Sequence, residues 1–110
     1  LWKVHPGKMN AFLTDARQHS KAIYEEWKKQ GMIVDYKVYL NSAPTGSQDW
    51  DVAIAFQLKN FAALDGFAGK AEEVANKHFG SKESRVAGGE KRAELAEVVS
   101  ARLMREVMLK

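Results

Sequence analysis

The residues able to do chemistry in this chain are few, and they limit the reactions open to it. The 110 residues include three histidines and no cysteines, which excludes thiol catalysis, disulfides and cysteine-ligated metals. His19 and His78 fall on two different predicted helices, with neither a His-x-x-x-His nor a His-x-x-Glu spacing, so we expect no metal site. The glycine-bearing turns match neither a serine-hydrolase nor a phosphate-loop pattern. No cofactor is expected.

His5 stands in the stretch "WKVHPGKMNAFL", for which there are two interpretations. A histidine beside a carboxylate or a phenol is a common general base, and Asp35 or Tyr39 could serve as its partner. Alternatively, Pro6 and Gly7 mark the joint between a strand and a helix, which explains the stretch without catalysis. The sequence assigns no catalytic residue.

Hydrophobic periodicity predicts the elements that would position these groups. We expect a strand at residues 1–5, then a long amphipathic helix from the Pro6–Gly7 break to Gly31. Residues 32–40 and 49–59 alternate as two strands of an antiparallel hairpin around a turn-rich loop at 41–48. Asn60 is expected to cap a second helix, which Gly66 and Gly69 weaken and Gly80 ends.

The C-terminal third of the chain allows two readings. Residues 81–89 are expected as a loop and residues 90–97 as a short helix. Residues 98–109 fit a continued helix by propensity and a strand by alternation. We favour the strand because it completes the order β-α-β-β-α-β, the ferredoxin-like arrangement. The predicted fold is therefore α+β, with a four-stranded antiparallel sheet and helices on one face.

Residue parity gives each predicted middle strand an apolar face and a mixed face. The apolar faces must pack against the helices, which leaves a second sheet face of polar side chains and small alanines. Such a face suits a pocket for a small organic ligand, and it also suits a wet interface with cross-strand ion pairs. The candidate ligand-binding residues are His5, Asp35, Lys37, Tyr39, Gln57, Arg102 and Glu106.

Length and composition indicate one domain spanning residues 1–110. The 17 basic and 14 acidic residues give a net charge of +3, and the basic residues are interleaved with glutamates, so no nucleic-acid partner is expected. No apolar run is long enough for a membrane span. We expect a soluble protein, either cytoplasmic or exported after loss of an N-terminal segment, because Leu1 already fits the middle of a strand.

Several segments together resemble the dimeric α/β-barrel superfamily: "KVHPGKMNAF", the long helix, the hairpin around "APTGSQDW" and the helix opening "KNFAALDGF". That superfamily includes NIPSNAP-like proteins, antibiotic-biosynthesis-monooxygenase-like proteins and many bacterial members. The resemblance implies that two copies pair their four-stranded sheets into a barrel, so the expected partner is a second copy of the chain. Likeness of fold does not supply the chemistry.

Three functional hypotheses stay open at this point. The first is a homodimeric domain that binds a small organic ligand in a cleft between sheet and helices. The second is a cofactor-independent enzyme of the monooxygenase-like or isomerase-like kind, using His5 with Asp35 or Tyr39. The third is a structural dimerisation module without a ligand.

Overall fold

The fold is an α+β domain with the element order β-α-β-β-α-α-β, seen in a computed structural model that describes residues 1–43, 46 and 49–109. The predicted loop at 41–48 therefore lies partly outside the described residues. The strands are β1 (Trp2–Val4), β2 (Asp35–Leu40), β3 (Val52–Gln57) and β4 (Ala96–Val98). The helices are α1 (Met9–Asp15), α2 (Lys21–Lys29), α3 (Phe67–Phe79) and α4 (Lys82–Ala93). A π-helical turn, η1 (Ala16–Ser20), joins α1 to α2, and a 3-10 turn, η2 (Phe61–Leu64), precedes α3.

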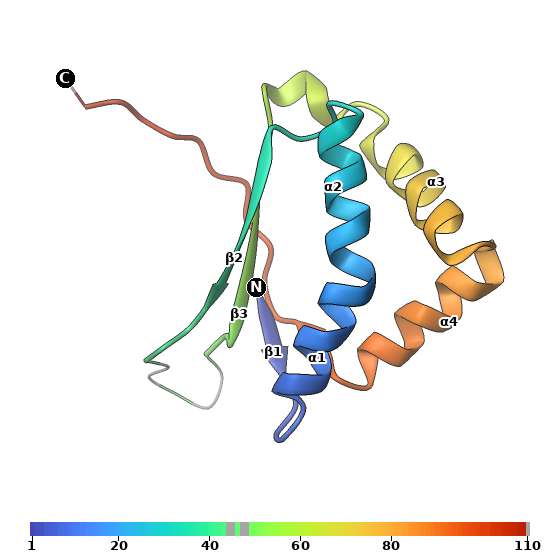
Figure 1. Cartoon of the computed structure of the whole chain (residues 1–110). Coiled ribbons are helices and arrows are strands. Elements are labelled where there is room, and N and C mark those ends of the chain that lie inside the picture. Colours follow the sequence, from blue (N-terminus) through green and yellow to red (C-terminus); the bar gives the residue numbers. More distant parts are fainter. Residues whose placement is uncertain (44–45, 47–48, 110) are drawn as a thin grey trace.

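The four strands form one antiparallel sheet in the order β2-β3-β1-β4. The β2–β3 hairpin is paired over six residues of each strand, from Asp35 opposite Gln57 to Leu40 opposite Val52. The short strand β1 joins this hairpin to β4, which pairs with it over three residues. Figure 1 shows the helices gathered on one side of the sheet, as predicted.

The predicted first helix is confirmed, with a widened turn in its middle. Pro6 and Gly7 separate β1 from α1, and Gly7 has φ +76°, a left-handed conformation that glycine adopts without steric cost. Gly31 has the same φ after the end of α2. The following strand begins at Asp35, three residues later than predicted, because Met32 and Ile33 are buried instead of pairing in the sheet.

The core divides into two clusters along the helix side of the sheet. The first joins Val4, Phe12, Val52 and Ala96, one from each of β1, α1, β3 and β4. The second lies between α2, α3 and the hairpin, and it is rich in aromatic side chains around Tyr24 and Trp27. Tyr36, Val52 and Ile54 pack in these clusters as predicted. The rest of the predicted apolar face is only partly covered, since Val38 and Leu40 of β2 are 49% and 52% exposed.

The C-terminal third differs from the prediction. Residues 82–93 form α4, so the predicted loop at 81–89 is wrong; Ser81 Oγ accepts a hydrogen bond of 3.0 Å from the Ser84 N–H and caps the helix. The predicted short helix at 90–97 ends early, because Ala96 already belongs to β4. The predicted strand at 98–109 is wrong for most of its length, since β4 ends at Val98 and the described residues from Val99 onward have no regular structure.

Candidate functional site

The open face of the sheet, opposite the helices, carries four of the predicted ligand-binding residues. By register, Asp35 lies opposite Gln57, Lys37 opposite Ala55 and Tyr39 opposite Ala53. Because Tyr36 packs on the helix side and side chains alternate along a strand, these pairs belong to the other face. On the neighbouring strands, Lys3 lies opposite Glu97 on that face. The polar face with small alanines in its middle is therefore present.

The first two residues of β2, Asp35 and Tyr36, are bound to α2 by polar contacts. The Asp35 carboxylate accepts a hydrogen bond of 2.9 Å from the Tyr36 N–H and lies 3.4 Å from Lys28 Nζ, and both contacts hold the pKa of this carboxyl below its usual value. Tyr36 Oη donates to Glu25 at 2.8 Å. Partial burial, reinforced by Glu25, raises the pKa of Tyr36 to about 12. Both side chains tie the hairpin to α2, so neither is a free reactive group.

The remaining predicted site residues are not brought to this place within one chain. His5 follows β1, and its N–H donates to the Leu95 carbonyl at 2.8 Å. β1 pairs with β3 at Trp2 opposite Val52, and His5 lies three residues further along, whereas Asp35 pairs with Gln57 at the other end of β3. Because the strands are antiparallel, His5 and Asp35 lie at opposite ends of the sheet. Arg102 and Glu106 lie on the exposed tail. A His5–Asp35 acid–base pair within one chain is therefore not formed.

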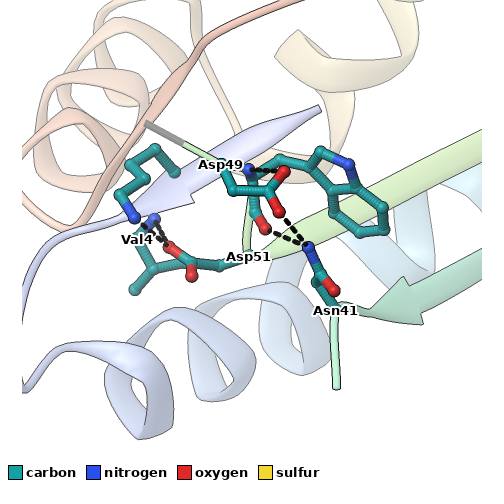
Figure 2. Close-up of polar contacts among 6 residues, drawn as sticks. Val4, Asn41, Asp49 and Asp51 are labelled. Carbon is teal, nitrogen blue, oxygen red and sulfur yellow. Dashed lines mark hydrogen bonds and ion pairs between the residues drawn. The ribbon is translucent and has the colours of Figure 1, made fainter. Parts of the chain in front are cut away.

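Asp51, the residue before β3, links the hairpin to β1 through its carboxylate. Its Oδ2 accepts a hydrogen bond of 2.8 Å from the Val4 N–H and lies 3.7 Å from Lys3 Nζ. Beside it, Asn41 Nδ2 donates to Asp49 Oδ2 at 3.2 Å and to the Trp50 carbonyl at 2.9 Å. Figure 2 shows these contacts closing the end of the hairpin against β1. The Asp51 carboxylate thus gives the Val4 N–H a hydrogen-bond partner beyond the short β1–β3 pairing.

An open groove lies between α4 and the strands β1 and β4, with a volume of about 540 Å³. It is a cleft between sheet and helix, as the first hypothesis requires, but its residues are not the predicted ones. Its lining includes Trp2, Gly89, Arg92, Ala93, Ala96 and Val98, with Glu97 beside them. Arg92 is the cation of the groove, and its Nε lies 3.6 Å from Asp15 Oδ2. A second hollow among the described residues, of about 100 Å³ between the turn after α2 and the η2–α3 junction, is smaller than the roughly 300 Å³ at the lower end of typical ligand pockets.

The groove exists because α4 presents small side chains to the sheet. Every residue of α4 is described, and none of them is buried. Gly89 and Ala93 line the groove with Trp2, Ala96 and Val98, so Arg92 is the one large side chain that α4 contributes to this lining. Sequence analysis missed this site because it assigned residues 81–89 to a loop. The sequence did contain a signal, since Ser81 followed by Glu83 in the first turn is a typical helix start.

Comparisons of the chain with protein-family models, curated proteins and solved structures found no match. Of the resemblance to the dimeric α/β-barrel superfamily, the structure shows the small α+β domain with a four-stranded antiparallel sheet. No family model matches the chain. Among the described residues, no helix has the length and apolar character needed to cross a membrane.

Proposed function

We propose that this protein is a binding module for a small organic carboxylate, held in the groove between α4 and β4. The observation that carries the proposal is the groove itself. Its volume of about 540 Å³ lies within the roughly 300–1,000 Å³ typical of small-molecule sites. Trp2, Ala96 and Val98 supply an apolar wall for the body of the ligand.

Arg92 gives the groove its polarity. Its buried Nε lies 3.6 Å from Asp15 Oδ2 on α1 and makes no hydrogen bond to the described residues, while the residue also lines the groove. A guanidinium group binds a carboxylate through two parallel hydrogen bonds, so its terminal nitrogens would receive the acid group of the ligand. The apolar wall on one side and this cation on the other would fix the orientation of the ligand.

The binding test uses anilinonaphthalenesulfonate, an aromatic anion whose fluorescence rises in apolar sites. A Cβ added at Gly89 meets no atom within 4 Å, so Gly89→Leu should fill the groove without a clash. We expect this variant to lose most of the fluorescence rise. Gly69→Leu on α3 is the matched control, because Gly69 also has open space around it and does not line the groove. Equal fluorescence of the two variants would contradict the proposed site.

The role of Arg92 is tested by ligand-observed NMR with two probes of similar shape, benzoate and benzamide. The wild-type chain should bind benzoate more tightly than benzamide. Arg92→Met retains an unbranched apolar stem, and it should remove this preference. A wild-type chain that binds both probes equally would contradict the carboxylate assignment, and the Gly89→Leu result would still report on the groove.

We further propose that the chain acts as a ferredoxin-like homodimer, with the open sheet faces of two copies toward each other. The strand order β2-β3-β1-β4 and its antiparallel pairing support this architecture. The tail supports a partner, because its apolar side chains have no cover in one chain; they are Leu103, Met104, Val107, Met108 and Leu109, 65–93% exposed. Apolar surface of this kind marks interaction sites. The tail extends away from the domain in Figure 1.

Light scattering coupled to gel filtration tests the dimer. The full chain should elute at twice the chain mass, and Ala55→Glu should shift it to monomer, because Ala55 is exposed on the open face. Ala22→Glu, an exposed position on α2, is the control and should leave the dimer intact. A chain ending at Ser100 should also become monomeric. A full chain that is monomeric at high micromolar concentration would rule out the dimer and leave the groove proposal standing.

A further inference from the structure

His19 and His78 meet where η1 comes against the last turn of α3. His19 belongs to the π-helical turn η1 and His78 to the last turn of α3. His19 Nδ1 lies 2.9 Å from His78 Nε2, although 59 residues separate them in the chain. The Phe79 ring packs against both imidazoles, with centroid distances of 4.7 Å and 5.0 Å. Two of the three histidines thus converge on one point.

We propose that His19 and His78 form a binding site for a divalent transition-metal ion, copper(II) or nickel(II). Two metal–nitrogen bonds of about 2.0–2.1 Å that meet at a right angle hold their nitrogens about 2.9 Å apart, whereas a tetrahedral angle needs about 3.3 Å. The 2.9 Å contact is a hydrogen bond between the two rings, and an ion that took the place of the shared proton at this spacing would meet the two nitrogens at the right angle. Nitrogen ligands in tetragonal geometry are typical of copper(II) and nickel(II).

The surroundings of the pair suit a cation that keeps part of its hydration. Both imidazoles are partly exposed, so an ion and its water ligands can reach them. His78 lies in the last turn of α3, where the negative end of the helix dipole favours positive charge. The nearest cations in the sequence, Arg17, Lys21 and Lys77, are exposed, and solvent ions screen their repulsion. The described residues contain no group of three or more metal-ligating side chains, so water would complete the coordination.

Two features hold the imidazoles in place before an ion arrives. The π turn contains His19 and is preceded and followed by regular α-helix; such turns often occur at functional sites. Behind Phe79, the backbone of α4 comes so close that a Cβ on Gly88 would lie 2.7 Å from the Phe79 ring. Because α4 confines this ring and the ring contacts both histidines, their side chains have little freedom to separate. A partly preorganised pair binds an ion at a lower entropic cost.

The test is calorimetric titration of the tag-free full chain with nickel(II), followed by copper(II) electron paramagnetic resonance. We expect one ion per chain with micromolar affinity. His19→Asn and His78→Asn should each weaken binding at least tenfold, while His5→Asn, the matched control, should leave it unchanged. The copper(II) spectrum should show coupling to two nitrogens in the wild-type chain and to one in either variant.

Circular dichroism of each variant separates loss of binding from loss of fold. If His19→Asn does not fold, His19→Gln and His78→Asn carry the test. Binding that persists in His78→Asn, or that disappears in His5→Asn, would overturn the assignment, as would a wild-type chain that binds no nickel(II) at millimolar concentration. The assignment would be supported if nickel(II) raised the unfolding midpoint of the wild-type chain and did not raise that of a folded variant lacking either histidine.

Discussion

The two ends of the helical layer are packed in different ways. Between α2, α3 and the hairpin, aromatic rings fill the space: Tyr24 lies 5.0 Å from Trp27, 5.4 Å from Tyr36 and 4.9 Å from Phe56, measured between ring centroids. Between α4 and β4, the facing side chains are small, and a groove of about 540 Å³ remains. The first region is part of the packed core, and the second contains the groove in which we propose that a ligand binds. Stability and binding are therefore expected to respond to different substitutions.

The largest expected effect comes from opening the aromatic region. Tyr24 is 9% exposed, and Tyr24→Ala should lower the free energy of unfolding by about 3–5 kcal/mol, because the cavity cannot collapse among rigid rings. Val86→Ala on α4 is the control; Val86 is 43% exposed, so its loss should change stability by less than about 0.5 kcal/mol. Urea denaturation measures both. Similar losses would mean that the two regions are equally packed.

Two adjacent glycines on α4 separate its packed side from its open side. A Cβ at Gly88 meets Phe79 at 2.7 Å, whereas a Cβ at Gly89 meets nothing within 4 Å. Gly88→Ala should therefore cost about 1–3 kcal/mol through overpacking. Gly89→Ala should instead stabilise the helix by up to about 1 kcal/mol, because alanine has the higher helix propensity. Thermal unfolding of the two variants should shift in opposite directions, and shifts of the same sign would contradict this arrangement of α4.

Alkaline pH should weaken the aromatic region next. The pKa of Tyr36 is 10.0 without its surroundings and about 12 in the fold, through burial and the contact with Glu25. Between these values the unfolded chain loses a proton that the folded chain retains, so stability should fall as the pH rises from about 10 to about 12. Tyr36→Phe should flatten this part of the profile in denaturation curves taken across that range. An unchanged slope in Tyr36→Phe would show that other groups dominate.

The smallest expected effect concerns the exposed ion pair at the end of the hairpin. Asp35 has a pKa below its unfolded value of 3.8, through the Tyr36 N–H and Lys28. Its contribution is therefore complete above that value and is lost as the pH falls through the folded-state pKa. Asp35→Asn should lower the denaturation midpoint only slightly at neutral pH, and the difference should vanish in acid, because exposed pairs contribute little. Lys28→Gln should produce the same small shift.

Local patterns were sufficient to predict much of this fold. The long helix, the hairpin, the Asn60 cap and the glycine stops follow from periodicity and backbone preference within about twenty residues. The Asn60 side chain accepts the Ala63 N–H at 3.1 Å, as a cap should, but the turn that it starts is a short 3-10 helix, since Gly66 with φ +69° interrupts it before α3. The covered face of the sheet was predicted for the same local reason.

The candidate sites were not predictable in this way. Parity placed Asp35, Lys37, Tyr39 and Gln57 on one face, yet it could not give the distance that separates them from His5, because that distance depends on how β1 registers against β3. The histidines of η1 and α3 each appear isolated in the sequence. Only the packing of the two helices brings them within 2.9 Å.

The sequence by itself determined the amphipathic helix, the alternating strands and the absence of thiol chemistry, because each of these depends on residues that are neighbours in the chain. The tertiary structure decided that the small side chains of α4 leave a groove beside β4, and that η1 brings His19 to His78 of α3. These features depend on contacts between residues far apart in the chain. Their free energies come from packing and exclusion of water, which no local pattern records.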